Sequence, residues 1–176
     1  MDFLLINILF FSVFYLIALL KDDFGIIDVA WGISFLALYV TGLLTANLPL
    51  TGRVLILGLA IFIWSLRLSG YILYRNLKLK HEDPRYAEMR KSWGKRIKLN
   101  AYFRVYMLQA LLSLAIASPI LAVLSQKKLV PFDTLYDYLG VIFLTIGFSV
   151  EAIADFQKNS FKSNPINIGK PCHTGL

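Results

Sequence analysis

The chain has 176 residues, of which 57% are hydrophobic and 16% are charged, and its formal net charge is +7. A soluble domain usually carries about 25% charged residues. A composition this apolar, gathered into long runs, therefore excludes an ordinary water-soluble domain and indicates a polytopic membrane protein. The single cysteine, Cys172, excludes a disulfide framework and a multi-cysteine metal site, and only two histidines are present to build another kind of metal site.

The apolar runs are long enough to cross a bilayer as helices. A run of roughly 18–23 residues spans a hydrocarbon core about 30 Å thick at about 1.5 Å per residue. The first run has no basic residue before it and no small-residue cleavage site after it, so we expect a retained span rather than a signal peptide. The sequence predicts an all-α, single-domain membrane bundle over residues 1–176. Its predicted spans are residues 3–20, 26–48, 54–74, 106–124 and 138–156.

The loop between the third and fourth runs is strongly basic. Residues 75–104 hold ten of the 18 Lys and Arg residues, and the positive-inside rule places such a loop in the cytoplasm. The N-terminus is then expected outside and the C-terminus in the cytoplasm. Asp83 and Pro84 are typical of a helix start, and Trp93-Gly94 of its end, so we expect an interfacial helix on the cytoplasmic leaflet. Contact with anionic lipid headgroups is expected, and nucleic-acid binding is not.

Four acidic or basic residues lie inside predicted spans, where a charge is costly unless it has a partner, a cavity or a ligand, and Asp28 and Arg67 are the first two. Asp28 lies one turn inside the second span. It is either a proton donor with a raised pKa, the partner of a buried base, or a carboxylate in contact with water. Arg67 does not deprotonate, so it must pair, bind an anion or snorkel to the surface. Pairing with Asp28, binding of a ligand phosphate and plain snorkelling all remain open.

Two tyrosines follow Arg67 near the end of the same span. Arg67, Tyr71 and Tyr74 are spaced four and three residues apart, so they share one helix face. A tyrosine hydroxyl can give a proton to a carbonyl oxygen during a reduction. An interfacial belt of tyrosines, with no chemical role, accounts for the same residues.

The last apolar run ends in a mixed acidic and basic face. Glu151, Asp155, Lys158 and Lys162 are spaced four, three and four residues apart, which places them on one side of a helix. Such a face at the membrane surface suits a charged ligand. The alternative is i,i+4 ion pairing at a helix end, which explains the two lysines more easily than the two carboxylates.

Four motifs follow one another along nearly the whole chain, and together they resemble those of a known family. The first two are Asp28-Val-Ala-Trp31-Gly32 and Trp64-Ser-Leu-Arg67-Leu68 with Tyr74-Arg75. The third is Glu82-Asp83-Pro84-Arg85-Tyr86 with Arg90 and Gly94. The fourth is Glu151-Ala-Ile-Ala-Asp155-Phe-Gln157-Lys158 with Phe161-Lys162, ending in Gly169-Lys170-Pro-Cys172-His-Thr-Gly175-Leu176. In this order they resemble bacterial membrane proteins of the steroid 5-alpha-reductase-like superfamily, in its domain-of-unknown-function branch.

The resemblance implies a helical fold shared with steroid reductases, sterol reductases and isoprenylcysteine carboxyl methyltransferases, in a bacterial inner membrane. It also implies NADPH near the cytoplasmic face and reduction of a carbon–carbon double bond conjugated to a carbonyl in a lipidic substrate. Asp155 matches a carboxylate that helps to hold the cofactor in related reductases, and Lys162 would contact a phosphate or ribose. The residues expected at the substrate end are Asp28, Tyr71 and Tyr74. Those expected at the cofactor end are Arg67, Glu151, Asp155, Lys158, Lys162 and Lys170.

Other functions fit the same sequence. One is an S-adenosylmethionine-dependent methyltransferase of the same fold, and another is an inert membrane remnant. An ion or proton transporter would rest on Asp28 and Arg67 alone. Members of the family continue past the equivalent of Gly175-Leu176 into a segment rich in Arg, His, Pro, Asn and Tyr, so we expect a C-terminally truncated member with an incomplete cofactor pocket.

Overall fold

The structure is a computed structural model that describes residues 3–46, 49–78, 82–126, 131–167, 170–173 and 175. Every regular element in these ranges is helical, which confirms the all-α prediction. The chain forms two compact units, Met1–Val130 and Pro131–Leu176. The assignment of the whole chain to a single membrane domain stays a prediction.

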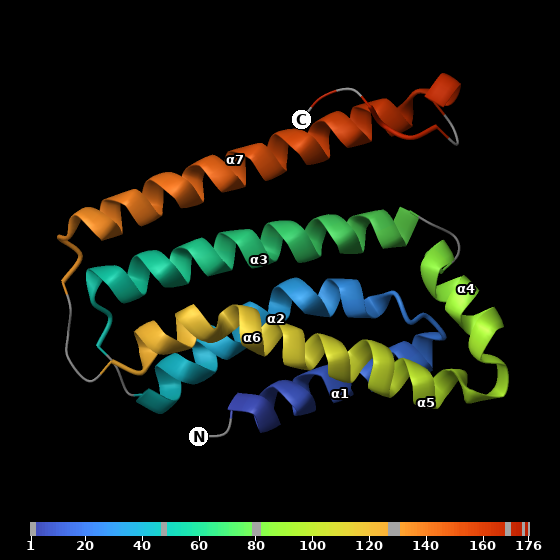
Figure 1. The fold of residues 1–176 in the computed structure, drawn as a ribbon, viewed down its shortest axis with the longest axis horizontal. Helices are drawn as coiled ribbons and strands as arrows, with labels where there is room; N and C mark the ends of the chain where they lie inside the picture. Colours follow the sequence, from blue (N-terminus) through green and yellow to red (C-terminus); the bar gives the residue numbers. More distant parts are fainter. Residues whose placement is uncertain are drawn as a thin grey trace. The chain divides into compact units, whose positions relative to one another are not determined.

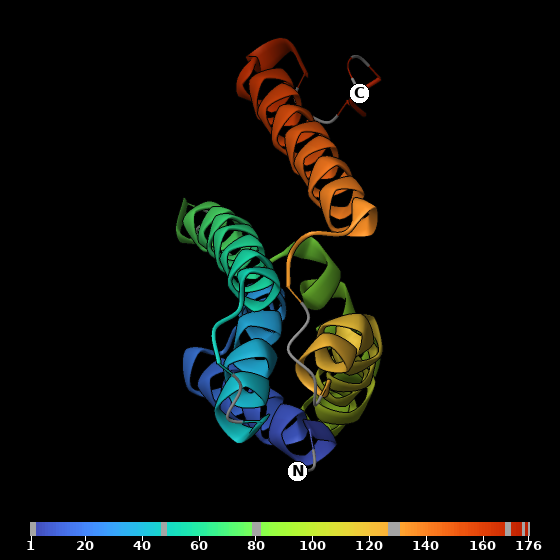
Figure 2. The ribbon, with the colours of Figure 1, turned by 90° about the vertical axis from the view of Figure 1, so that its left-hand side faces the viewer.

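The first unit is a bundle of long helices with a short helical crosspiece at one end. The long helices are α1 (Phe3–Lys21), α2 (Ile26–Ala46), α3 (Gly52–Lys78) and α6 (Leu108–Leu124). Helix α2 packs against α1, α3 and α6, so it is the central helix of this unit (Figures 1 and 2). The crosspiece is formed by α4 (Pro84–Trp93) and α5 (Ile97–Ala101), which lie at the end of the bundle where α3 ends and α2 begins (Figure 1).

The crosspiece begins as its local sequence predicts. The Asp83 side chain accepts a hydrogen bond from the backbone N–H of Arg85, Pro84 occupies the first turn, and α4 ends at Gly94, whose φ is 49°. A 3₁₀ turn, Gly94–Arg96, links α4 to α5, and a π-helical turn, Tyr102–Met107, links α5 to α6. The helix expected here from the sequence is therefore present, whereas its position at the membrane interface stays a prediction; the turns that connect it to α6 were not expected.

The second unit consists of α7 (Leu135–Ser163), a 3₁₀ turn (Pro165–Asn167) and the described part of the tail. Helix α7 begins with a capping box, in which the Thr134 hydroxyl accepts from the Asp137 N–H and the Asp137 carboxylate accepts from the Thr134 N–H at 3.0 Å. The tail returns to α7, because Gly175 lies against the Gln157 side chain. Its φ of 107° and this close contact both favour glycine at position 175.

Within the described ranges, five helical stretches are long and apolar enough to cross a membrane, which fits the multi-pass prediction. They are Phe3–Lys21, Ile26–Ala46, Gly52–Lys78, Pro84–Leu124 and Leu135–Ser163. Large apolar side chains such as Leu16, Leu59 and Phe143 are 57–70% exposed on these helices. In a bilayer such side chains face lipid rather than water, so the protein is embedded in a lipid bilayer.

Polar contacts between helices reinforce the packing of the first unit. The Asn7 side chain is 1% exposed, and its amide nitrogen donates to the carbonyl oxygen of Ala110 at 2.6 Å and to the Ser113 hydroxyl at 2.8 Å. Ser69 of α3 donates to the carbonyl oxygen of Val29 of α2 at 2.9 Å. Because lipid offers no competing hydrogen bonds, such contacts fix how membrane helices face one another.

Candidate functional site

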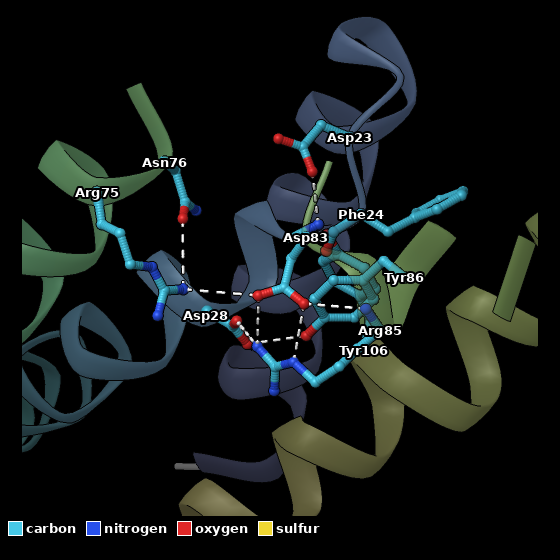
Figure 3. A network of polar contacts seen from close by, with 10 residues as sticks. Asp23, Phe24, Asp28, Arg75, Asn76, Asp83, Arg85, Tyr86 and Tyr106 are labelled. Atoms are coloured by element: carbon cyan, nitrogen blue, oxygen red, sulfur yellow. Dashed lines mark hydrogen bonds and ion pairs between the residues drawn. The ribbon is translucent and has the colours of Figure 1, made fainter. Parts of the chain in front are cut away.

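The candidate site lies at the end of the first unit, where the α1–α2 turn meets α4. Its charged and hydroxyl groups form two sets of contacts, one around Asp28 and Asp83 (Figure 3) and one around Arg90, which we name together the polar junction. Most of its members come from two segments that are far apart in sequence. The polar junction consists of Asp22, Asp28, Glu82, Asp83, Arg85, Tyr86 and Arg90.

Asp28, in the first turn of α2, is held by two side chains of α4. Arg85 Nη2 donates to Asp28 Oδ2 at 2.8 Å, and the Tyr86 hydroxyl donates to Asp28 Oδ1 at 2.8 Å (Figure 3). The Asp28 side chain is 23% exposed, whereas that of Arg85 is 60% exposed. The base that faces Asp28 is thus Arg85, whereas pairing with Arg67 was one of the possibilities that the sequence left open.

Arg85 joins Asp28 to Asp83, the residue that caps α4. Arg85 Nε donates to Asp83 Oδ1 at 3.0 Å, and Nη2 donates to Asp83 Oδ2 at 3.2 Å. These side-chain hydrogen bonds hold the pKa of Asp83 below its ordinary value, against the opposing effect of burial. Arg75, at the end of α3, approaches the same carboxylate with an Nη2–Oδ2 distance of 3.8 Å. Two guanidinium groups therefore converge on Asp83.

Arg75 also carries an unsatisfied donor. Its Nε atom is buried and has no hydrogen-bond partner among the residues that the structure describes. Its Nη2 donates to Asn76 Oδ1 at 3.4 Å, a long hydrogen bond. A buried donor without a partner costs about 1–3 kcal/mol. Arg75 is thus the member of this region best suited to receive an additional acceptor, such as an oxygen of an anionic ligand.

A second arginine fastens α4 to the α1–α2 turn. Arg90 Nε and Nη2 each donate to one oxygen of Glu82 at 3.0 Å, which is the bidentate geometry preferred by guanidinium and carboxylate. Arg90 Nη1 donates to Asp22 Oδ1 at 2.9 Å, and Nη2 donates to the Asp22 carbonyl oxygen at 3.0 Å. Glu82 Oε1 also accepts from the backbone N–H of Phe24 at 2.9 Å. This arrangement fixes the turn that leads into Asp28.

The chain folds this way locally because short-range contacts shape the turn. Asp22 adopts a left-handed conformation with φ 51°, as α1 ends. Asp23 Oδ1 accepts from the Gly25 N–H at 2.8 Å, which turns the chain toward α2. The hydroxyl of Tyr106, whose side chain is fully buried, donates to the Phe24 carbonyl oxygen at 3.1 Å and so ties the turn to the start of the fourth span.

The substrate-end residues named from the sequence all lie in the first unit, on two helices. Asp28 belongs to the polar junction, whereas Tyr71 and Tyr74 lie on α3. Tyr71 is half-buried, and Tyr74 is 57% exposed with Lys78 Nζ 4.3 Å from its ring centroid. Arg67, assigned to the cofactor end, is half-buried on α3 as well. The catalytic roles of these residues stay predictions.

The remaining cofactor-end residues lie in the second unit. Glu151 and Asp155 are half-buried on α7, and Lys158 and Lys162 are exposed on the same helix. Lys170 is exposed in the tail. Helix α7 is therefore continuous through Glu151, Asp155, Lys158 and Lys162, as the predicted acidic and basic face requires. The assignment of these residues to a cofactor stays a prediction, and the residues searched for metal sites contain no group of three His, Cys, Asp or Glu side chains.

Sequence reasoning assigned no role to Glu82, Arg85, Tyr86 or Arg90, although the motifs contained them. Their partners are distant in sequence, since Arg85 and Asp28 are 57 residues apart and Arg90 and Asp22 are 68 apart. One signal in the sequence could have identified them. Acidic and basic residues alternate around the predicted Asp83 cap, so several charges at the start of one helix need partners.

These features define a multi-pass helical membrane protein with a carboxylate, arginine and tyrosine network at one end of its bundle. The chain belongs to the family described as "Protein of unknown function (DUF1295)", whose model matches residues 14–176. Comparisons with curated proteins and with solved structures gave no match. The family match includes both the polar junction and α7.

Proposed function

We propose that the protein is a membrane-embedded, NADPH-dependent reductase of a carbon–carbon double bond conjugated to a carbonyl in a lipidic substrate. The resemblance of its motifs to the steroid 5-alpha-reductase-like superfamily supports this proposal. The observation that carries it is the pair of hydrogen bonds on Asp28 from Arg85 and Tyr86, at the end of an apolar bundle. Such a site offers positioned polar groups to one end of an otherwise lipid-soluble molecule.

At the substrate end, the residues have distinct proposed tasks. Asp28 accepts hydrogen bonds from Arg85 and Tyr86, so its proposed task is to orient these donors at the substrate end. A hydroxyl from Tyr71 or Tyr74 would protonate the carbonyl oxygen or stabilise the negative charge that develops there. The surrounding apolar helices would exclude water from the reacting bond.

The donor set fits an anionic dinucleotide. Lys158, Lys162 and Lys170 are suited to phosphate groups, and the carboxylates of Glu151 and Asp155 are suited to ribose hydroxyls. NADPH, when bound, supplies the hydride, and these residues hold and orient it.

Direct binding of NADPH to the purified full chain is the first test. Fluorescence of the nicotinamide should change on titration, and Asp155→Asn or Lys162→Gln should weaken binding at least about tenfold if a charge-assisted contact of about 1.5–3 kcal/mol is lost. Asp28→Asn should leave NADPH affinity unchanged and abolish oxidation of NADPH by an enone lipid. Glu88→Gln, which changes an exposed acid on α4, is the matched control.

Two results would count against the reductase. One is NADPH affinity that is the same in Asp155→Asn, Lys162→Gln and the unchanged chain. The other is transfer of a labelled methyl group from S-adenosylmethionine to a lipidic acceptor without oxidation of NADPH, which would support the methyltransferase instead.

We also propose that the crosspiece faces the cytoplasm of a bacterial inner membrane, with the N-terminus outside and the C-terminus inside. The ten Lys and Arg residues of positions 75–104 support this orientation. Reporter fusions at Trp93 and at Gln126 should report opposite sides of the membrane. A cytoplasmic signal at Gln126 would reverse the proposed orientation.

A further inference from the structure

The crosspiece and the π-helical turn that follows it carry basic side chains that the polar junction does not use. Residues 84–104 contain seven Lys and Arg residues but one acidic residue, Glu88. Arg85 and Arg90 are engaged by carboxylates of the polar junction. The other five are exposed, and within the described ranges none of them forms an ion pair. We name these five the basic belt: Lys91, Lys95, Arg96, Lys98 and Arg104.

The basic belt lies beside apolar side chains at the start of a membrane span. Leu99 is 61% exposed and Phe103 is 59% exposed, both within the segment that holds the belt. Arg104 lies in the π-helical turn that leads directly into α6. Figure 1 shows α4 and α5 at the end of the first unit's bundle, continuing into α6. The belt thus lies where long helices of the first unit end.

We propose that the basic belt is a binding surface for the phosphate groups of anionic phospholipids in the bilayer that the protein spans. Charge complementarity favours anionic phospholipids, because the five cations of the basic belt form no ion pair with an acidic residue in the described part of the chain. The exposed Leu99 and Phe103 would enter the acyl region while the cations contact phosphates above it, as in interfacial basic helices. The surface does not depend on the proposed reductase activity, since none of its residues belongs to the polar junction.

Native mass spectrometry of the full chain, released from detergent micelles that contain added lipid, tests the proposal. The unchanged protein should retain phosphatidylglycerol in preference to phosphatidylcholine. Each cation near an anionic surface contributes roughly a fivefold gain in binding, so Lys91→Gln, Lys95→Gln and Lys98→Gln together should reduce phosphatidylglycerol retention by at least about fivefold. The matched control removes three lysines elsewhere, through Lys158→Gln, Lys162→Gln and Lys170→Gln, and should keep the preference.

Two outcomes would overturn the proposal. One is unchanged retention of phosphatidylglycerol by the Lys91, Lys95 and Lys98 variant. The other is an equal loss in both triple variants, which would mean that net charge alone sets lipid retention. If the belt variant does not fold, the salt dependence of the unchanged protein decides. Selective retention should fall steeply as sodium chloride rises to about 1 M, where screening acts over about 3 Å, and salt-independent retention would contradict a surface built on exposed charges.

Discussion

Arg85 Nη2 lies 2.8 Å from Asp28 Oδ2, and this contact joins the first turn of α4 to the first turn of α2. The same guanidinium contacts Asp83, so a single side chain holds two carboxylates that begin two different helices. Since Arg85 is 60% exposed, water weakens the ion pairs, and their main effect is to set geometry rather than to supply a large stabilising energy.

A double-mutant cycle should measure this contact. Arg85→Gln and Asp28→Asn should each destabilise the protein, and the double variant should lose less than the sum, with a coupling free energy of about 1 kcal/mol. Unfolding in mixed micelles with increasing denaturing detergent provides the measurement. Arg96→Gln, an exposed change on the same crosspiece, should leave the free energy of unfolding nearly unchanged. Strictly additive losses would show that the two side chains do not interact.

The contacts of Arg90 with Glu82 and Asp22 should contribute more to the free energy of unfolding than the contact of Arg85 with Asp28. Arg90 is 32% exposed, Glu82 is 13% exposed, and four hydrogen bonds from Arg90 reach Glu82 and Asp22. Arg90→Ala leaves the Glu82 carboxylate without its cation, so we expect a loss of about 2 kcal/mol in the free energy of unfolding. Arg90→Lys should recover little of it, because an ammonium group cannot form the bidentate contact. Full recovery of the free energy of unfolding in Arg90→Lys would show that the charge of Arg90, and not its bidentate geometry, stabilises this contact.

The lowered pKa of Asp83 makes part of the stability dependent on pH. Because its pKa in the folded protein lies below the ordinary value of 3.8, the folded state binds this proton less tightly than the unfolded state does. The stabilisation is therefore fully present above about pH 4 and is lost as the pH falls through the folded-state pKa. The difference in unfolding free energy between the unchanged protein and Asp83→Asn should shrink over that range. A difference that is constant down to pH 2 would contradict the contribution of Asp83.

Helices α2 and α3 approach closely at Gly32, and a matched pair of glycines tests this. A Cβ at Gly32 would collide with the Ser69 hydroxyl and lie 3.3 Å from the Ser65 carbonyl oxygen, whereas a Cβ at Gly70 would meet nothing within 4 Å. Gly32→Ala should destabilise the protein by roughly 1–3 kcal/mol through overpacking. Gly70→Ala should be neutral or stabilising by up to about 1 kcal/mol, as expected for a helix interior. Thermal unfolding of both variants in one detergent gives the comparison.

The sequence predicted the spans because long apolar runs have few alternatives to crossing a bilayer. Their ends were less certain, since polar residues can extend a helix beyond the hydrocarbon core. The last helix begins at Leu135 rather than near residue 138. The capping box of Thr134 and Asp137 was a local signal for this start. At the crosspiece, Asp83 and Pro84 predicted the start of α4 correctly because capping depends only on neighbouring residues.

The polar junction could not be predicted in the same way. Asp28 was identified as a carboxylate in need of a partner, but a single sequence does not say which of several arginines lies near it. Arg67 was considered because it is in the adjacent span, whereas Arg85 meets Asp28 only because the crosspiece turns back across the end of the bundle. Pairing between distant residues depends on the folded path of the chain, and that path is set by packing rather than by local spacing.

The amide of Asn7 has a consequence for the order in which the protein is made. Its two acceptors lie 103 and 106 residues further along the chain, so neither has been synthesised when the first span leaves the ribosome. The final rotation of α1 about its axis can therefore be fixed only after α6 has entered the membrane. The contacts of α1 with α2 can form earlier, so the hydrogen bonds of Asn7 mark the step at which α6 joins helices that are already in the membrane.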